Sequence, residues 1–352
     1  MGGGVALLLA TSGEPDPGDA EVAVEDDELA ALGRPPGSWR PYAPDSPFNR
    51  PVGARPRIDP RSDAIVRRLT ARPPDALLTF DESDPAAAAG DYARPLYWAD
   101  ADDPRHRVLC TDFGGDCAIS GEGVRIPAEA RPAAGEDGHL TVVDGEWEWS
   151  FFRVQRKDAA TGQLVVGNGD RIRVDGDGLD GGGGAARFGG LAGRIRWEAL
   201  RDAIRRRGAL PHALFMTVAC ARAGAFVPPA TGAERKRACA DQRDRPEMGR
   251  RFWLAMRPDE VEALDVPEWL KVIARTMATH GAFVGDQGGD NWGLQFESPQ
   301  GFLSFGVENP FALYALQKPG GVVDGNGSYA YRLREGVPWA GRLRALAAPG
   351  RP

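Results

Sequence analysis

Short runs of strand-forming residues, each bounded by Gly, Pro or Asp, restrict the fold of this chain more than any other sequence feature. Examples are residues 76–80, 95–98, 107–110 and 139–144. Such runs are typical of β-sandwiches and barrels, whereas a doubly wound parallel sheet needs strands and helices in regular alternation. That alternation is missing from the sequence. We therefore predict a mainly β fold, a β-sandwich or jelly roll with a few helical insertions.

A hairpin is the clearest local prediction. Residues 139–144 are expected to form a buried strand and 146–155 a second strand, and the Asp144-Gly145 dipeptide between them favours the tight turn of a hairpin. A second pair of short strands, 163–166 and 171–174, is expected across the four turn-like residues that separate them.

The 352 residues are expected to form one β-rich domain over 38–349. Residues 1–37 begin with a short apolar stretch and continue as an acidic, Pro-rich segment. This pattern predicts a clipped export signal followed by a disordered leader, with an ordinary flexible N-terminus as the alternative. Helical insertions are expected at 62–69, after a Ser cap, and at 266–280, where apolar residues recur at helical spacing.

The net charge bears on the partners that the chain can have. A formal charge of −7 disfavours nucleic acid, because binding to phosphates requires a basic face. A local arginine run from Arg194 to Arg207 is interpreted as a solvated helix face, with an anion-binding patch as the alternative. No apolar run reaches about 18 residues, so no membrane span is expected.

The four cysteines predict two local disulfides. Cys110 and Cys117 are seven residues apart, and Cys220 and Cys239 are nineteen apart. Other pairings and free cytosolic thiols remain alternatives, while the absence of Cys-x-x-Cys spacing disfavours zinc. Paired cysteines fit a secreted, extracellular protein.

Four residues are candidates for acid–base catalysis: His139, His212, Asp286 and Glu297. Each histidine opens a predicted buried strand, where it can act as a general acid or base or can simply pack. The two carboxylates flank a predicted strand near a tryptophan, an arrangement that suits sugar chemistry. A solvent-facing polar stripe is the alternative for these two.

Aromatic and basic residues could form a sugar-binding surface. Trp147 and Trp149 alternate with acidic residues, so both point to one face of their strand, either as a stacking platform or as core. Trp292 is a further stacking candidate. Arg171 and Arg173 could neutralise a uronate.

A glycine-rich stretch, residues 176–193, is expected to be a loop. Asp175, Asp177 and Asp180 at its start could converge on a structural calcium ion, although the pattern is not an EF-hand. A plain Gly/Asp turn is the alternative. No other cofactor is required.

Several segments carry a family resemblance. They are 39–51, 137–144, 211–215 and 281–286. Together they resemble a group of exported actinobacterial proteins. The resemblance implies secretion and a jelly-roll-like body, and it assigns no catalytic residues that could be carried over.

The predicted function is therefore that of a secreted carbohydrate-active protein. A glycoside hydrolase or polysaccharide lyase would act on a polysaccharide or cell-wall glycan in an open β-sandwich groove. A lectin-like glycan-binding protein is the alternative, and a secreted peptidase is a weaker third. The Gly-x-Ser-x-Gly, His-Glu-x-x-His, P-loop and dinucleotide motifs are absent from the sequence.

Overall fold

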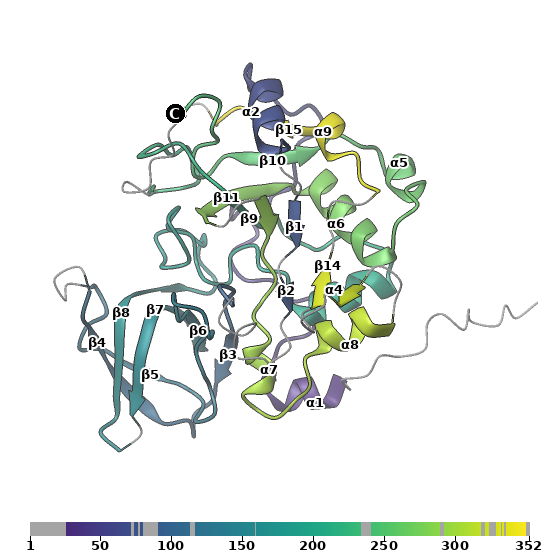
Figure 1. Ribbon diagram of the computed structural model, residues 1–352. Coiled ribbons are helices and arrows are strands. Elements are labelled where there is room, and N and C mark those ends of the chain that lie inside the picture. Colours follow the sequence, from purple (N-terminus) through teal and green to yellow (C-terminus); the bar gives the residue numbers. More distant parts are fainter. Residues whose placement is uncertain are drawn as a thin grey trace, which may run out of the picture.

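Two six-stranded mixed sheets, one three-stranded sheet and short helices make up the computed structural model (Figure 1). It describes residues 26–71, 74–76, 78–79, 91–112, 117–158, 160–233, 241–288, 292–317, 321–323, 329–331, 333 and 336–349. The prediction of a mainly β fold with helical insertions is confirmed at this level.

The first large sheet, sheet 1, lies in the upper half of Figure 1. Its strand order is β1 (Pro74–Ala76), β12 (Trp292–Leu294), β9 (Leu214–Val218), β11 (Ala282–Gln287), β10 (Arg251–Leu254) and β15 (Leu343–Ala345). The pairs β1–β12 and β9–β11 are parallel, and the others are antiparallel. Sheet 1 thus joins strands from both halves of the chain.

The second large sheet, sheet 2, lies at the lower left of Figure 1. Its order is β3 (Leu96–Ala99), β6 (Leu140–Asp144), β7 (Trp147–Asp158), β8 (Gln163–Arg173), β4 (Arg105–Cys110) and β5 (Gly123–Arg125). The β6–β7 hairpin is confirmed, and Gly145 in its turn has a φ of 62°. The pair predicted at 163–166 and 171–174 is instead one continuous strand, β8, because it follows the long β7 as its antiparallel partner.

The two faces of sheet 2 differ in chemistry. Leu140, Val142, Trp149 and Phe151 point to one face and form a small hydrophobic core of their own. Since side chains alternate along a strand, Thr141, Glu148 and Ser150 point to the opposite face. All three are buried. Sheet 2 therefore presents a buried polar face to the rest of the molecule.

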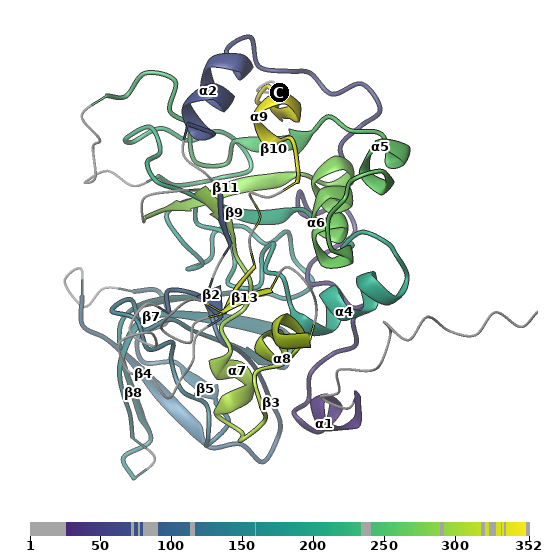
Figure 2. The same cartoon turned by 45° about the vertical axis from the view of Figure 1, so that its right-hand side comes forward.

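The helices are α1 (Asp26–Ala31), α2 (Ser62–Leu69), α4 (Trp197–Arg205), α5 (Pro258–Glu262), α6 (Glu268–Thr279), α7 (Gln300–Leu303), α8 (Pro310–Gln317) and α9 (Trp339–Arg342). Figure 2 shows α2, α5, α6 and α9 beside sheet 1, and α1, α7 and α8 at the lower end of the molecule. The predictions at 62–69 and 266–280 are confirmed by α2 and α6. The small sheet contains β2 (Leu78–Thr79), β13 (Gly321–Val323) and β14 (Tyr329–Tyr331). No helix in the described ranges is long and apolar enough to cross a membrane.

The predicted leader needs a correction at its C-terminal end. Residues 26–31 form α1, whose Leu29 is buried in the main core, and Arg34 is buried as well. The described part of the segment 1–37 is therefore ordered, because apolar and ionic contacts to the domain offset the entropy of ordering it.

One predicted disulfide is present. Cys110 and Cys117 are bonded, with 6.1 Å between their Cα atoms. This bond joins the end of β4 to the residues that lead into β5. Cys239 lies outside the described residues, so the pairing of Cys220 with Cys239 stays a prediction.

Candidate functional site

Five charged or titratable side chains meet between the two large sheets. We call them the inter-sheet cluster: Arg94, His139, Glu148, Arg194 and Asp286. Arg94 and His139 precede β3 and β6, Glu148 lies on β7, Asp286 lies on β11, and Arg194 follows the glycine-rich loop. Both arginines act electrostatically on His139 and on Asp286, so the five groups belong to one site.

The glycine-rich loop, residues 176–193, contacts both large sheets at this site. A Cβ atom on Gly190 would collide with the hydroxyls of Thr141 and Ser150 on sheet 2. A Cβ on Gly184 would lie 2.7 Å from Asp286 Oδ2 on sheet 1. Only backbone fits between the two surfaces, which explains why this stretch is rich in glycine.

The loop carbonyls hold both arginines. Arg194 donates hydrogen bonds to Gly190 O (3.0 Å) and Gly183 O (2.9 Å), and its guanidinium stacks on Phe215, 3.6 Å from the ring centroid. Arg94 donates to Gly182 O at 3.0 Å. These carbonyl contacts orient the guanidiniums without neutralising them.

The charge of the two arginines is left uncompensated at close range. Both are almost fully buried, with exposed fractions of 2% for Arg94 and 1% for Arg194. Among the described residues, no carboxylate lies within 4 Å of either guanidinium, and Arg94 Nη1 has no hydrogen-bond partner. Burial lowers the pKa of Arg94 to about 10 and that of Arg194 well below its usual value, where the proximity of Arg94 adds to the effect.

His139 is held neutral by the same surroundings. Its ring is buried, and Nδ1 finds no partner in the part of the chain that the structure describes. Nε2 lies 3.7 Å from Asp137 Oδ2. Burial, followed by the charges of Arg94 and Arg194, lowers the pKa of His139 well below 6.5. An imidazole in this state can accept a proton at neutral pH.

The pKa of Asp286 is raised, whereas that of His139 is lowered. The residue as a whole is partly exposed, while its carboxyl group is buried. Burial raises the pKa of Asp286 to about 6, and nearby Asp137 adds to the rise, while the backbone N–H of Gln287 and the two arginines oppose it. This carboxyl can therefore carry a proton in weakly acidic solution.

Glu148 is fixed by donors and is better suited to holding the site than to reacting. It accepts hydrogen bonds from the Tyr42 hydroxyl (2.6 Å), the Ser150 hydroxyl (3.2 Å) and the N–H of Gly190. Burial raises its pKa, and these bonds oppose the rise. It ties β7 to the loop that carries Arg194.

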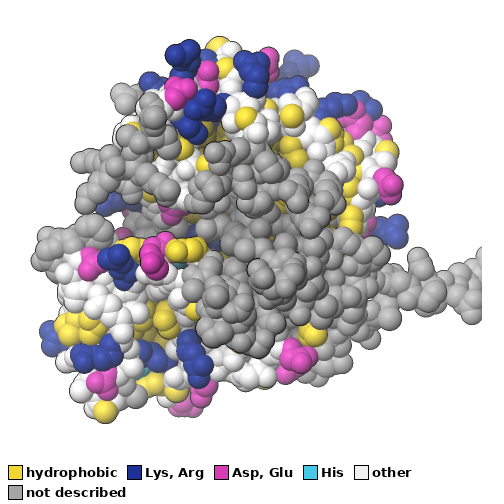
Figure 3. Space-filling view, in the orientation of Figure 1, with side chains coloured by type: hydrophobic (Ala, Val, Ile, Leu, Met, Phe, Trp, Pro, Cys, Tyr) yellow, Lys and Arg dark blue, Asp and Glu magenta, His cyan; other side chains and the backbone are white. Residues whose placement is uncertain are grey.

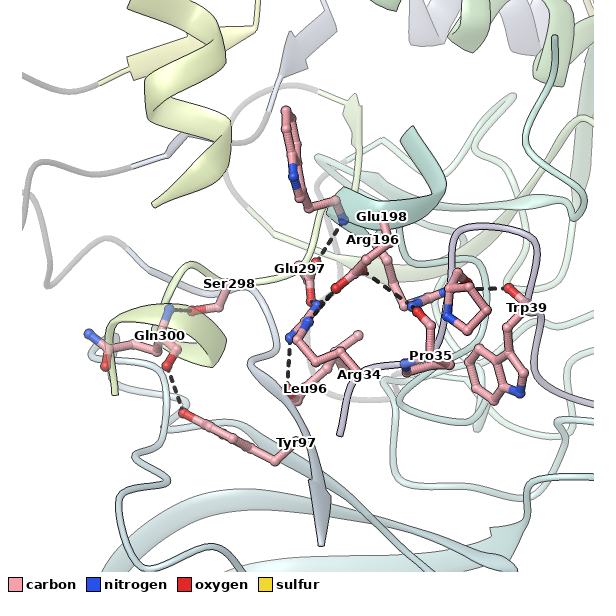
Figure 4. Close-up of polar contacts among 12 residues, drawn as sticks. Arg34, Pro35, Trp39, Leu96, Tyr97, Arg196, Glu198, Glu297, Ser298 and Gln300 are labelled. Carbon is pink, nitrogen blue, oxygen red and sulfur yellow. Dashed lines mark hydrogen bonds and ion pairs between the residues drawn. The ribbon is translucent and has the colours of Figure 1, made fainter. Parts of the chain in front are cut away.

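Two of the four predicted catalytic residues lie elsewhere. His212 is buried, its Nδ1 lies 3.0 Å from Ala213 O, and burial lowers its pKa to about 4. Glu297 belongs to a separate buried ion cluster with Arg34 and Glu198 (Figure 4). The structure thus brings together His139 and Asp286 only, because the other two are satisfied by packing and by ion pairs.

The buried ion cluster around Glu297 joins distant parts of the chain. Arg34 Nη2 lies 2.6 Å from Glu297 Oε2, and Arg34 also pairs with Glu198 at the start of α4. Glu297 Oε1 accepts a hydrogen bond from Trp197 N at 2.8 Å. Arg196 lies 3.3 Å from Glu198 Oε2. Figure 4 shows the side chains of Arg34, Glu198 and Glu297 directed at one another.

The predicted sugar-binding surface is not assembled. Trp149 and Trp292 are core residues with exposed fractions of 2% and 1%. Trp147 is partly exposed, but the guanidiniums of Arg171 and Arg173 lie 4.4 and 5.7 Å from its ring centroid. These two arginines also pair with surface carboxylates. Trp147 and Trp149 do lie on one face of β7, as the alternation predicts. That face is covered by core packing around Trp149 and by arginine side chains over Trp147.

The predicted calcium ligands do not converge. Asp175 pairs with Arg173 at 2.7 Å, and Asp177 Oδ1 accepts a hydrogen bond from Leu179 N at 3.0 Å. Asp180 takes a positive φ of 58° beside Gly181. Across the ranges that the structure describes, no group of three or more His, Cys, Asp or Glu residues is arranged to hold a metal ion. Calcium binding stays a prediction.

Sequence reasoning missed both arginines of the cluster. Arg194 was grouped with the basic run of α4 and interpreted as solvated, yet Arg194 and Arg196 are buried. The sequence signal for burial is the apolar stretch Leu191-Ala192-Gly193 directly before Arg194.

Comparisons of the chain with models of known families, with curated proteins and with solved structures found no match.

Proposed function

We propose that the inter-sheet cluster is an active site that cleaves a carboxylate-bearing polysaccharide by β-elimination, in an exported protein. One observation carries this proposal: Arg94 and Arg194 are buried side by side without a close carboxylate in the described chain, and Arg94 Nη1 is unpartnered. Guanidinium groups bind planar carboxylates through paired, charge-assisted hydrogen bonds. A uronate carboxylate would supply the missing counter-charge.

The neighbouring groups suit the proton transfers of that reaction. With its carboxylate neutralised by the arginines, a uronate becomes more acidic at C5. Neutral His139 takes the C5 proton, the C4–C5 double bond forms, and the C4–O bond to the next sugar breaks. Protonated Asp286 then gives its proton to the leaving oxygen. Atoms and charge balance without a cofactor.

Elimination is favoured over the two other carbohydrate functions. A hydrolase needs two carboxyl groups set on either side of the scissile bond, whereas Glu148 is fixed by three hydrogen-bond donors and Asp286 is left as the reactive carboxyl of the cluster. A lectin-like protein would present an open aromatic strip, and Trp149 and Trp292 are in the core. The Cys110–Cys117 disulfide is compatible with export. The finer description of the body as a sandwich or jelly roll is part of this proposal.

The test is an assay of uronate-containing and neutral polysaccharides for unsaturated products, read by their ultraviolet absorbance. We expect cleavage of a uronate polymer, and a loss of about 10²- to 10³-fold in kcat for Arg94→Met, as for other groups that stabilise developing charge. Arg257→Met is the matched control, because Arg257 pairs with Asp259 on the exposed face of α5.

Three outcomes would overturn the proposal. New reducing ends without unsaturated products would indicate hydrolysis. Binding without turnover would indicate a lectin-like protein. Equal activity of Arg94→Met and Arg257→Met, with both variants folded, would place the chemistry outside the inter-sheet cluster.

A further inference from the structure

A hollow in the surface lies apart from the inter-sheet cluster. It has a volume of about 370 Å³ and is lined by parts of segments 47–57, 227–229, 249–251 and 346–349 and by Phe283. We call it the arginine–proline pocket. Its size falls in the range of small-molecule sites, about 300–1,000 Å³. The hydrogen bond from Ala347 N to Arg57 O (2.8 Å) ties two of its walls together.

The charged part of this lining is entirely basic. Arg50, Arg57, Arg250 and Arg251 line the pocket, and no acidic side chain belongs to its described lining. Arg250 is neutralised by Asp59 at 2.9 Å and by Glu247 at 2.8 Å. On the face shown in Figure 3, basic side chains together with some acidic ones gather at the upper end, over α2.

Arg251 and Arg57 both lack a carboxylate within ion-pair distance among the described residues, and Arg251 is the less exposed of the two. It donates to the carbonyl oxygens of His280 (2.9 Å from Nε) and Arg50 (2.6 Å), and its guanidinium lies 4.9 Å from the Phe283 ring centroid. Burial alone lowers its pKa to about 10. A desolvated guanidinium held by carbonyls gains from an anion that approaches its remaining donors.

The rest of the lining consists of apolar side chains and glycines. Phe283 is buried at its base, and Val227, Pro228, Pro229 and Leu346 contribute further apolar walls. An apolar surface next to an uncompensated cation matches a molecule with an anionic head and a hydrocarbon body. A free sugar or a divalent cation lacks one or both of these properties.

We infer that the arginine–proline pocket binds a small amphipathic carboxylate, with the carboxylate at Arg251 and the hydrocarbon body against Phe283. This inference does not depend on the chemistry of the inter-sheet cluster. The nearby arginines on the rim, Arg50 and Arg57, would attract the anion toward the pocket.

Calorimetric titration of the full chain with octanoate, octanol and octylammonium tests the inference. We expect octanoate to bind about 10- to 100-fold more tightly than octanol, the value of one or two charge-assisted hydrogen bonds, and octylammonium to bind least. Arg251→Met should remove most of the difference between octanoate and octanol, with folding checked by near-ultraviolet circular dichroism.

A second variant keeps the test independent of Arg251, which also supports the end of α6. Gly53 lines the pocket, and a Cβ added to it meets nothing within 4 Å, so Gly53→Phe fills the space without a local clash. Gly341→Phe is the matched control, since Gly341 is equally open and lies outside the lining. We expect octanoate binding to be lost in the first variant and kept in the second. Equal binding by both, equal affinity for octanol, or no binding at millimolar octanoate would overturn the inference.

Discussion

Removing Arg34 should destabilise the protein more than almost any other single charge deletion. The side chains of Arg34, Glu198 and Glu297 have exposed fractions of 1%, 4% and 0%. Arg34→Met keeps most of the side-chain volume but leaves two carboxylates in the core. Arg196 still faces Glu198 at 3.3 Å, so Glu297 becomes the uncompensated charge.

The expected loss is large because a buried charge without its partner keeps its desolvation penalty. We expect the free energy of unfolding to fall by about 3–5 kcal/mol, the range for breaking buried ion pairs. The double variant Arg34→Met, Glu297→Gln should recover about 1–2 kcal/mol of this loss, since a neutral amide can still accept the Trp197 N–H bond that Glu297 accepts at 2.8 Å. Urea unfolding followed by tryptophan fluorescence measures all of these values.

The pH dependence of the loss has a defined sign. Burial acts to raise the pKa of both carboxyls, and in the intact cluster Arg34 opposes that effect at each. Without Arg34, the pKa of Glu297 in the folded state rises further above its unfolded value. A raised carboxyl pKa contributes stability at low pH that is lost as the pH rises through the folded pKa. The deficit should therefore be smaller at about pH 5 than at about pH 7.5.

A surface pair provides the control for this experiment. Arg257 and Asp259 are 3.0 Å apart, with side chains 68% and 70% exposed. Arg257→Met should leave the free energy of unfolding almost unchanged, because an exposed ion pair is screened by water. A loss in Arg34→Met no larger than this, or one that is constant between the two pH values, would refute the reasoning.

Two further predictions concern the inter-sheet cluster. Gly190→Ala should cost about 1–3 kcal/mol in urea unfolding, because its Cβ collides with Thr141 and Ser150, whereas Gly53→Ala, in open space, should cost almost nothing. The proposed cleavage needs protonated Asp286, so kcat/KM for a uronate polymer should fall as the pH rises through about 6. Equal stability of the two glycine variants, or a rate that climbs steadily from weakly acidic to alkaline pH, would contradict these two predictions.

Local patterns were sufficient for several elements of the fold. The β6–β7 hairpin follows from alternation around an Asp-Gly turn, and α6 follows from apolar residues at helical spacing. The Cys110–Cys117 disulfide follows from their close spacing. Each of these features is decided by residues near one another in the chain, which is why a single sequence reveals them.

The candidate site could be predicted only in part. His139 is a candidate because it opens a predicted strand, and Asp286 because it belongs to an acidic group near Trp292; both lie in the inter-sheet cluster. Arg94 and Arg194 were missed because nothing in their immediate sequence identifies a partner. Their shared environment depends on the glycine loop lying between the sheets, which is a tertiary contact.

The sequence by itself determined the β6–β7 hairpin and the helices α2 and α6, since these elements rest on periodicity, capping and turn chemistry within a few residues. Tertiary structure alone decided which charges are satisfied. Glu297 and Asp286 look alike in the sequence, but Glu297 meets Arg34 across 263 positions of the chain, while Asp286 meets two arginines that have no carboxylate close to them in the described structure. The energy of a charge depends on its burial and on its neighbours in space, and distant segments supply both.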